Sequence, residues 1–195
     1  MGSTAAQVGL LLVNAVAGFF LFIIVLRFLL QAVRADFYNP ISQFVIKATN
    51  PLLVPVRKLV PGFGGFDIAA LVLLVAVELV AIILSLLIMD YSPLPVTNIA
   101  IWAVLGAVGL FLKLYFWGIL IMIVASWLAP QSHNPALLLL RQIVDPVMKP
   151  IRKMLPDMGG LDISPIIVFL GIQVLEVILI GMARSSGAPG FVIGL

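Results

Sequence analysis

Four apolar stretches constrain what this chain can fold into. They lie at about residues 8–30, 68–89, 99–129 and 163–182. Each is long enough to cross the ~30 Å hydrocarbon core of a bilayer as a helix, for which about 20 residues suffice. The whole chain is 63% hydrophobic and only 10% charged, whereas a soluble domain is about 45–50% apolar and about a quarter charged. We therefore predict an all-α integral membrane protein with four transmembrane helices.

The polar residues between these stretches are duplicated. Residues 39–70 and 134–165 align without a gap, and 11 of the 32 aligned positions are identical. Chance similarity between apolar segments would match leucine and valine, whereas these identities are Asn, Pro, Arg, Lys, Gly, Asp and a single Ile. We infer an internal duplication, with a first repeat at 1–95 (loop 31–67) and a second at 96–195 (loop 130–162). Each repeat has two spans, so the repeats are parallel and their pseudo-symmetry axis is expected along the membrane normal.

The motif residues of the two loops start helices, stop them or form turns. Each Asn-Pro or Asp-Pro step predicts an N-cap followed by proline at the first helical position, so each loop is expected to hold two short helices. Their apolar and basic faces are typical of amphipathic helices in the membrane interface. The last Asp of each loop is expected to cap the span that follows. The motif residues are Asn39, Pro40, Asn50, Pro51, Pro55, Arg57, Lys58, Pro61, Gly64, Gly65 and Asp67, and then Asn134, Pro135, Asp145, Pro146, Pro150, Arg152, Lys153, Pro156, Gly159, Gly160 and Asp162.

Two segments of the second repeat carry separate expectations. The stretch at 99–129 fits one long tilted helix, because its only turn signals are the weak ones at Gly106 and Gly109. These glycines, with Ala103 and Ala107, form a small-residue face that lets a neighbour approach closely. The neighbour is either another span of the chain or a second copy. The tail at 183–195 is rich in small residues and is expected to be loose.

Basic residues orient the spans. Four of the 11 Lys and Arg residues lie in the first loop and four in the second, while residues 1–7 and the turn at 90–98 have none. Because cytoplasmic loops carry an excess of Lys and Arg, we expect both loops in the cytoplasm and both termini in the periplasm or outside the cell. A tag at either terminus that proved cytoplasmic would overturn this orientation.

The motifs together resemble a known family. They comprise Arg27-Phe-Leu-Leu-Gln31, Asp36-Phe-Tyr-Asn-Pro40, Pro55-x-Arg-Lys-x-x-Pro61 and its copy Pro150-x-Arg-Lys-x-x-Pro156. This pattern resembles the YggT family of bacterial inner-membrane proteins, whose plastid and cyanobacterial relatives are called YlmG. The resemblance covers nearly the whole chain in its tandem two-repeat form. The first repeat departs from it, because Asp67-Ile-Ala-Ala lacks the Ser-Pro that follows Asp162.

The resemblance implies a multi-pass accessory protein of the inner membrane and no established catalytic residue. Photosynthetic relatives are linked to assembly of b-type cytochrome and to nucleoid distribution. Bacterial members are associated with cell division and with osmotic or cation stress. We therefore expect a non-enzymatic role in membrane-protein assembly, division or stress response, through the basic amphipathic loops.

The Arg-Lys pairs of the two loops allow two interpretations. They are either anchors on anionic lipid, each worth ~1 kcal/mol near the surface, or parts of a basic pocket that grips a lipid headgroup or a partner's acidic segment. Anchoring is the leading interpretation, and exact duplication of the spacing is the argument for the pocket, because simple anchoring would not require it. The expected partners are an anionic bilayer, other membrane proteins and a second copy of the chain. Nucleic acid is not expected, because four basic residues per loop, offset by acids, neutralise few phosphates.

Charged residues within the spans are the sharper signal, because their burial in lipid is costly and they are often functional. At 1.5 Å per residue, Lys113 lies ~24 Å from the loop end of its span, Glu176 ~21 Å and Glu78 ~16 Å. This depth predicts an ion pair between Lys113 and Glu176. The alternative is a cation or proton path through Glu78 and Glu176. Gln173 is a further polar residue of the last span.

The composition excludes several kinds of site. The chain has no cysteine and one histidine, His133, which excludes thiolate metal sites, disulfides and bis-histidine haem within one chain. No phosphate-binding fingerprint is present, since Gly62-x-Gly64-Gly65 does not match one. We expect no catalytic, cofactor-binding or metal-binding residues. The leading hypothesis is the accessory protein, and the alternative is a cation transport or channel component in osmotic homeostasis that uses Glu78, Lys113 and Glu176.

Overall fold

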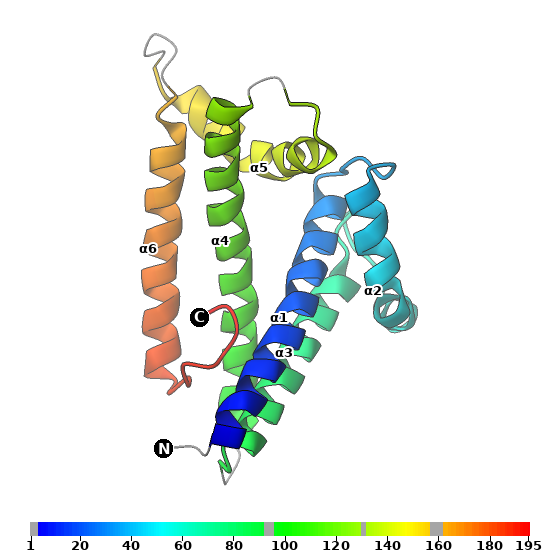
Figure 1. Ribbon diagram of the computed structural model, residues 1–195, viewed down its shortest axis with the longest axis vertical. Coiled ribbons are helices and arrows are strands. Elements are labelled where there is room, and N and C mark those ends of the chain that lie inside the picture. The colour runs from blue at the N-terminus through cyan, green and yellow to red at the C-terminus, as the bar shows by residue number, and fades with distance from the viewer. Residues whose placement is uncertain (1–3, 92–95, 130–131, 157–161) are drawn as a thin grey trace.

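The computed structural model describes residues 4–91, 96–129, 132–156 and 162–195, and these residues form six α-helices (Figure 1). Four of the helices are long and apolar enough to cross a membrane, as predicted. They are α1 (Thr4–Ala32), α3 (Ile68–Ile88), α4 (Val96–Leu128) and α6 (Ser164–Ser185). The other two, α2 (Pro40–Leu59) and α5 (Pro135–Met154), lie in the two duplicated loops.

The two repeats have the same architecture, α1–α2–α3 and α4–α5–α6. Helices α1 and α4 run in one direction and α3 and α6 in the other, so the repeats are parallel (Figure 1). Helix α4 is continuous over 33 residues, which confirms one long span between 99 and 129. It contacts α1, α3, α5 and α6 and therefore holds the two repeats together.

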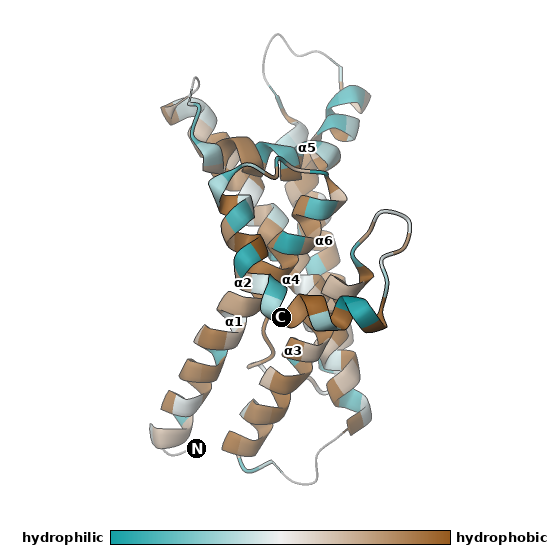
Figure 2. Cartoon of the chain, turned by 90° about the vertical axis from the view of Figure 1, so that its right-hand side faces the viewer, coloured by the Kyte–Doolittle hydropathy of each residue, from teal (hydrophilic) through white to brown (hydrophobic). Residues whose placement is uncertain are grey.

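The exposed surface of the spans is apolar. Large side chains such as Phe19, Leu11 and Val177 have more than half of their surface exposed. Figure 2 shows hydrophobic residues along the spans, with hydrophilic residues concentrated on the connecting helices and loops. Lipid is the solvent that such a surface requires, because exposed apolar area is unfavourable in water.

Helices α2 and α5 correct one prediction. Each is a single helix that continues through its internal prolines, Pro51 and Pro55 or Pro146 and Pro150. Asn50 and Asp145 therefore lie inside helices and do not cap second ones. Figure 1 shows that the helices bend instead of stopping, as expected where proline removes backbone hydrogen bonds.

Packing explains why the prolines do not end these helices. Val45 and Leu53, on either side of Pro51, are both 1% exposed and belong to the main apolar core with residues of α1 and α3. Thr49 Oγ1 also donates to the Val45 carbonyl at 2.8 Å. A proline inside a helix costs about 3 kcal/mol, and burial of the apolar side chains along the helix opposes this cost.

The tail after α6 corrects a second prediction, because it is not loose. Gly187, at φ +72°, follows the helix, and Ala188 N donates back to the Ala183 carbonyl at 2.9 Å. This is the hydrogen-bond pattern of a Schellman ending. It turns the chain back into the bundle, where the terminal residues lie beside α4 (Figure 1). Residue 195 thus lies part-way along α4 (Figure 1).

The small-residue face of α4 receives this tail. A Cβ at Gly106 would lie 2.6 Å from the Ile193 carbonyl oxygen, and one at Gly109 would collide with the Gly194 carbonyl. Val192 is buried among Ile82, Trp102 and their neighbours. The neighbour that this face admits is therefore a non-helical segment of the same chain, which neither alternative had included.

Candidate functional site

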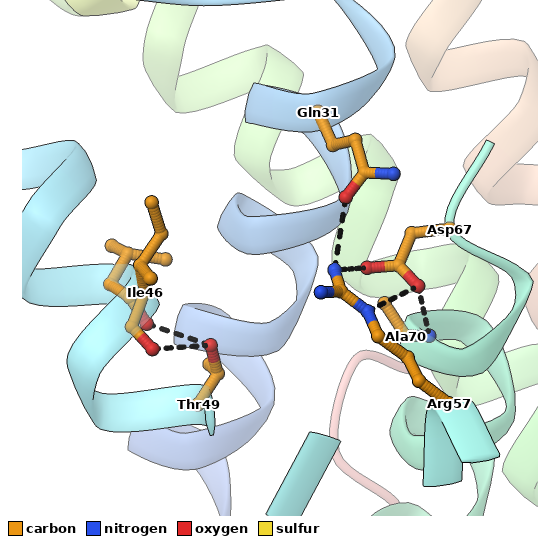
Figure 3. A network of polar contacts seen from close by, with 7 residues as sticks. Gln31, Ile46, Thr49, Arg57, Asp67 and Ala70 are labelled. Carbon is orange, nitrogen blue, oxygen red and sulfur yellow. Dashed lines mark hydrogen bonds and ion pairs between the residues drawn. The ribbon is translucent and has the colours of Figure 1, made fainter. Parts of the chain in front are cut away.

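The first Arg-Lys pair takes part in a clamp between α2 and α3, made by Arg57, Asp67 and Gln31 (Figure 3). Arg57 lies in the last turn of α2, and its Nη2 is 2.5 Å from Asp67 Oδ2. Asp67 is the N-cap of α3, as predicted, and its Oδ1 accepts a hydrogen bond from Ala70 N at 3.3 Å. Gln31, near the end of α1, accepts a hydrogen bond from Arg57 Nη2 at 3.1 Å. The clamp thus joins all three helices of the first repeat.

The second repeat forms the equivalent clamp from Arg152, Asp162 and Ser164. Arg152 Nη2 and Nε lie 2.6 and 3.0 Å from Asp162 Oδ2. Ser164 donates to Asp162 Oδ1 through its amide at 3.0 Å and its hydroxyl at 2.5 Å. The N-cap of α6 is Ile163, so Asp162 stabilises the helix start from one residue further out than predicted.

The two clamps differ in exposure. Asp67 is 2% exposed and Arg57 35%, whereas Asp162 is 38% exposed and Arg152 54%. Burial acts to raise the pKa of Asp162, but the Ser164 hydrogen bonds and the neighbouring Arg152 outweigh it and hold that pKa below its ordinary value. The carboxylate is therefore charged at neutral pH, as the ion pair requires.

The loop residues around the first clamp have structural roles. Gly64 and Gly65 have φ values of +63° and +87°, a region that side chains with a Cβ seldom adopt. They form a tight turn in which Phe63 and Phe66 exchange backbone hydrogen bonds of 3.0 and 3.2 Å. The counterparts Gly159 and Gly160 lie outside the described residues.

The first Asn-Pro step of each loop confirms its prediction. Asn39 Oδ1 accepts from Ile41 N, and Asn134 Oδ1 accepts from Ala136 N, both at 2.9 Å. Asn39 also donates from Nδ2 to the Pro135 carbonyl at 2.8 Å, which joins the starts of α2 and α5. These motif residues therefore cap the helices and connect the repeats.

The lysines of the Arg-Lys pairs are left free by the clamps. Lys58 and Lys153 are exposed, and none of the ion pairs found among the described residues includes either of them. Each pair thus combines an arginine that holds the fold with a lysine available at the surface.

Within the spans, Glu78 is the most deeply buried charged residue. It is 0% exposed, and its Oε1 would lie 2.9 Å from a Cβ placed on Gly106. The Ile193 backbone is near enough to interact electrostatically, but among the described residues neither carboxylate oxygen has a partner with hydrogen-bond geometry. Glu78 is therefore enclosed between α3, α4 and the tail.

The predicted ion pair between Lys113 and Glu176 is wrong. Lys113 Nζ donates to the Leu195 carbonyl at 3.1 Å, and no ion pair within the described residues joins it to Glu176. Glu176 is half-buried on α6 and Gln173 is exposed. Matching depths do not place two side chains on facing sides of their helices, and the intervening tail provides Lys113 with a backbone partner.

Sequence reasoning missed two groups at this site. Gln31 appears in the Arg27–Gln31 motif but was not assigned as a partner of Arg57. Arg141 and Lys149 were counted only as loop charges, although both line a polar cavity beside the second clamp. Aligning the two repeats could have found Arg141 and Lys149, because the first repeat has the apolar residues Ile46 and Val54 at the equivalent positions. Across the described residues, no group of three or more His, Asp or Glu side chains is placed to hold a metal ion.

Comparison with known proteins agrees with the internal duplication. The sequence model of the CCB3/YggT family matches this chain twice, over residues 6–88 and 101–183. The chain belongs to the CCB3/YggT family. Among similar family members, a Pseudomonas aeruginosa protein is 43% identical, with 91% of each chain covered. The YggT protein of Escherichia coli K12 is 36% identical over 92% of this chain and 91% of its own length. No solved structure matches significantly.

Proposed function

We propose that this YggT-family chain is a non-enzymatic accessory protein of the bacterial inner membrane, which presents two basic amphipathic helices at the cytoplasmic surface. The observation that carries the proposal is the pair of clamps. Each fixes the last turn of an amphipathic helix to the start of the next span through its arginine, while the adjacent lysine stays exposed. Such an arrangement positions charge for an external partner without using it in folding.

The partners that suit this surface are acidic segments of other membrane proteins and the anionic lipid surface, since both complement Lys58 and Lys153. The cytoplasmic position rests on the excess of Lys and Arg in the two loops. A role in membrane-protein assembly, cell division or the stress response belongs to this proposal, because each process requires membrane proteins to be gathered or supported.

Crosslinking in native membranes tests the proposal. Lys58→Gln with Lys153→Gln removes the two free charges and leaves both clamps intact. We expect a defined protein partner that crosslinks to the wild-type chain to be recovered several-fold less with this variant. Arg34→Gln with Lys47→Gln is the matched control, because it removes the same charge from exposed loop residues outside the clamps. A partner set that is unchanged in the first variant, or reduced equally in both, contradicts the proposal.

A second function rests on one observation, the full burial of Glu78 without a hydrogen-bond partner in the part of the chain that the structure describes. An intramembrane carboxyl of this kind is typical of cation and proton pathways. Purified protein in dye-loaded proteoliposomes is expected to show no cation or proton flux above that of empty vesicles. Flux that Glu78→Gln abolishes and Glu176→Gln leaves intact would replace the accessory function with transport.

A further inference from the structure

A cavity of about 370 Å³ lies beside the second clamp, between α4, α5 and the start of α6. Its polar wall consists of Ser126, Arg141, Asp145, Lys149, Arg152 and Asp162. Its other wall is apolar and includes Ile119 and Met122 of α4. A smaller cavity of about 90 Å³ adjoins it and shares Met122, Ser126 and Arg141. We call the larger cavity the second-repeat pocket.

The second-repeat pocket carries one positive charge beyond what its own acids neutralise. Lys149 Nζ is 2.8 Å from Asp145 Oδ2, and Arg152 is paired with Asp162. Arg141 has no carboxylate partner in the ion pairs of the described residues. Its guanidinium therefore lies in the wall of both cavities with its charge uncompensated, which suits an anionic ligand.

The first repeat provides an internal reference for this pocket. The residues equivalent to Met122 and Ser126 are Arg27 and Gln31. Gln31 accepts a hydrogen bond from Arg57 at 3.1 Å, and Arg27 lies near enough to interact electrostatically with Arg57 and Asp67. Longer side chains of the chain itself thus surround the first clamp, and Asp67 is only 2% exposed.

The substitutions in the second repeat open the same place and move its positive charge to new positions. Met122 replaces Arg27, and Ser126 replaces Gln31. Arg152 has therefore lost the partner that Gln31 provides to Arg57 in the first repeat. Arg141 and Lys149 stand where the first repeat has Ile46 and Val54. A duplicated structural clamp has therefore become an open pocket with Arg141 and Lys149 in its wall. Its net charge is unchanged, because Met122 replaces Arg27 and Asp145 replaces Asn50.

We propose that the second-repeat pocket binds the phosphate-bearing headgroup of an anionic phospholipid, with Arg141 and Lys149 as its main cationic contacts. Position favours a lipid over an acidic peptide. The pocket lies where α4 ends and α6 begins, at the edge of the apolar spans, and its apolar wall includes the half-buried Met122 and Ile123 of α4. A ligand with a charged head and an apolar body fits both walls. This inference rests on the proposed function, since it names one partner of the basic surface.

Native mass spectrometry of the full-length purified protein tests the lipid site, with phosphatidylglycerol as the anionic probe and phosphatidylcholine as the neutral one. The wild type is expected to retain phosphatidylglycerol preferentially. Arg141→Gln with Lys149→Gln should weaken that binding about tenfold or more, because two cations near the headgroup are removed. The control Arg34→Gln with Lys47→Gln, which removes the same charge from the other loop, should change the affinity less than about twofold, because these residues lie outside the pocket.

A second variant keeps all the charges of the pocket. Ser126→Gln introduces the side chain that Gln31 provides in the first repeat, and it should lower phosphatidylglycerol binding by filling the pocket. Equal loss in the pocket and control variants, or no preference for phosphatidylglycerol, would overturn the site. Displacement of the lipid by millimolar inorganic phosphate, or by an acidic peptide, would overturn its assignment to a lipid. Because the assay contains no protein partner, failure here leaves the crosslinking result of the accessory proposal untouched.

Discussion

Gly109→Ala is expected to lower the free energy of unfolding by about 1–3 kcal/mol, the usual cost of an overpacked core. The added methyl group would collide with the Gly194 carbonyl, and it would lie 3.1 Å from a methyl carbon of Leu179. The first obstacle is backbone, so a rotamer change cannot relieve it. The tail must shift away from α4 or leave the bundle. Thermal or chemical unfolding in mild detergent measures the loss.

The matched control for Gly109 is Gly181→Ala in α6. A Cβ at Gly181 would have no atom of the described residues within 4 Å, so this change should raise stability by up to about 1 kcal/mol through helix propensity. Alanine brings the same gain in helix propensity at Gly109. A fall in the free energy of unfolding at that position therefore measures the collision with the tail. Trp102 donates to Ser186 at the start of the tail, so its fluorescence should respond to Gly109→Ala and not to Gly181→Ala. Two variants of equal stability would show that the tail does not pack in the α4 groove.

Asp67→Asn is expected to lower the free energy of unfolding by about 2–4 kcal/mol. Breaking a buried ion pair costs about 3–5 kcal/mol, and we reduce this value because Arg57 is 35% exposed and keeps its bond to Gln31. Asparagine is as good an N-cap as aspartate, so the start of α3 is retained. The substitution therefore isolates the charge of the clamp. Equilibrium unfolding at neutral pH provides the measurement.

Asp162→Asn is the matched variant of the second clamp, and it should cost about 1 kcal/mol or less, as exposed ion pairs do. Its contribution has a defined pH dependence, because the pKa of Asp162 is lowered in the folded state from its ordinary value of 3.8. The stabilisation is present above that value and is lost as the pH falls through the lowered pKa. Similar costs for the two variants would contradict the assignment of the first clamp as the buried, structural one.

The elements predicted correctly depend on local sequence. Four apolar stretches of sufficient length produced α1, α3, α4 and α6, because a bilayer selects spans by length and hydrophobicity. Asn39 and Asn134 cap α2 and α5 through bonds to amides only two residues away. The duplication was visible because its motif residues are polar and keep their spacing. Hydrophobic length, capping and repetition therefore determined the fold class, the parallel repeats and the candidate motif.

Only the tertiary structure decided the features that depend on contacts between distant segments. The local sequence predicts helix starts at Pro51 and Pro146, but both lie inside helices, and in α2 burial of Val45 and Leu53 opposes the local cost of the proline. Lys113 bonds to Leu195, 82 residues away, because the tail fills the groove that glycines leave on α4. The two clamps share one motif, yet residues on α1 and α4 make the first closed and the second open. A single sequence determines which segments can form helices, whereas which side chains meet depends on how those helices pack together.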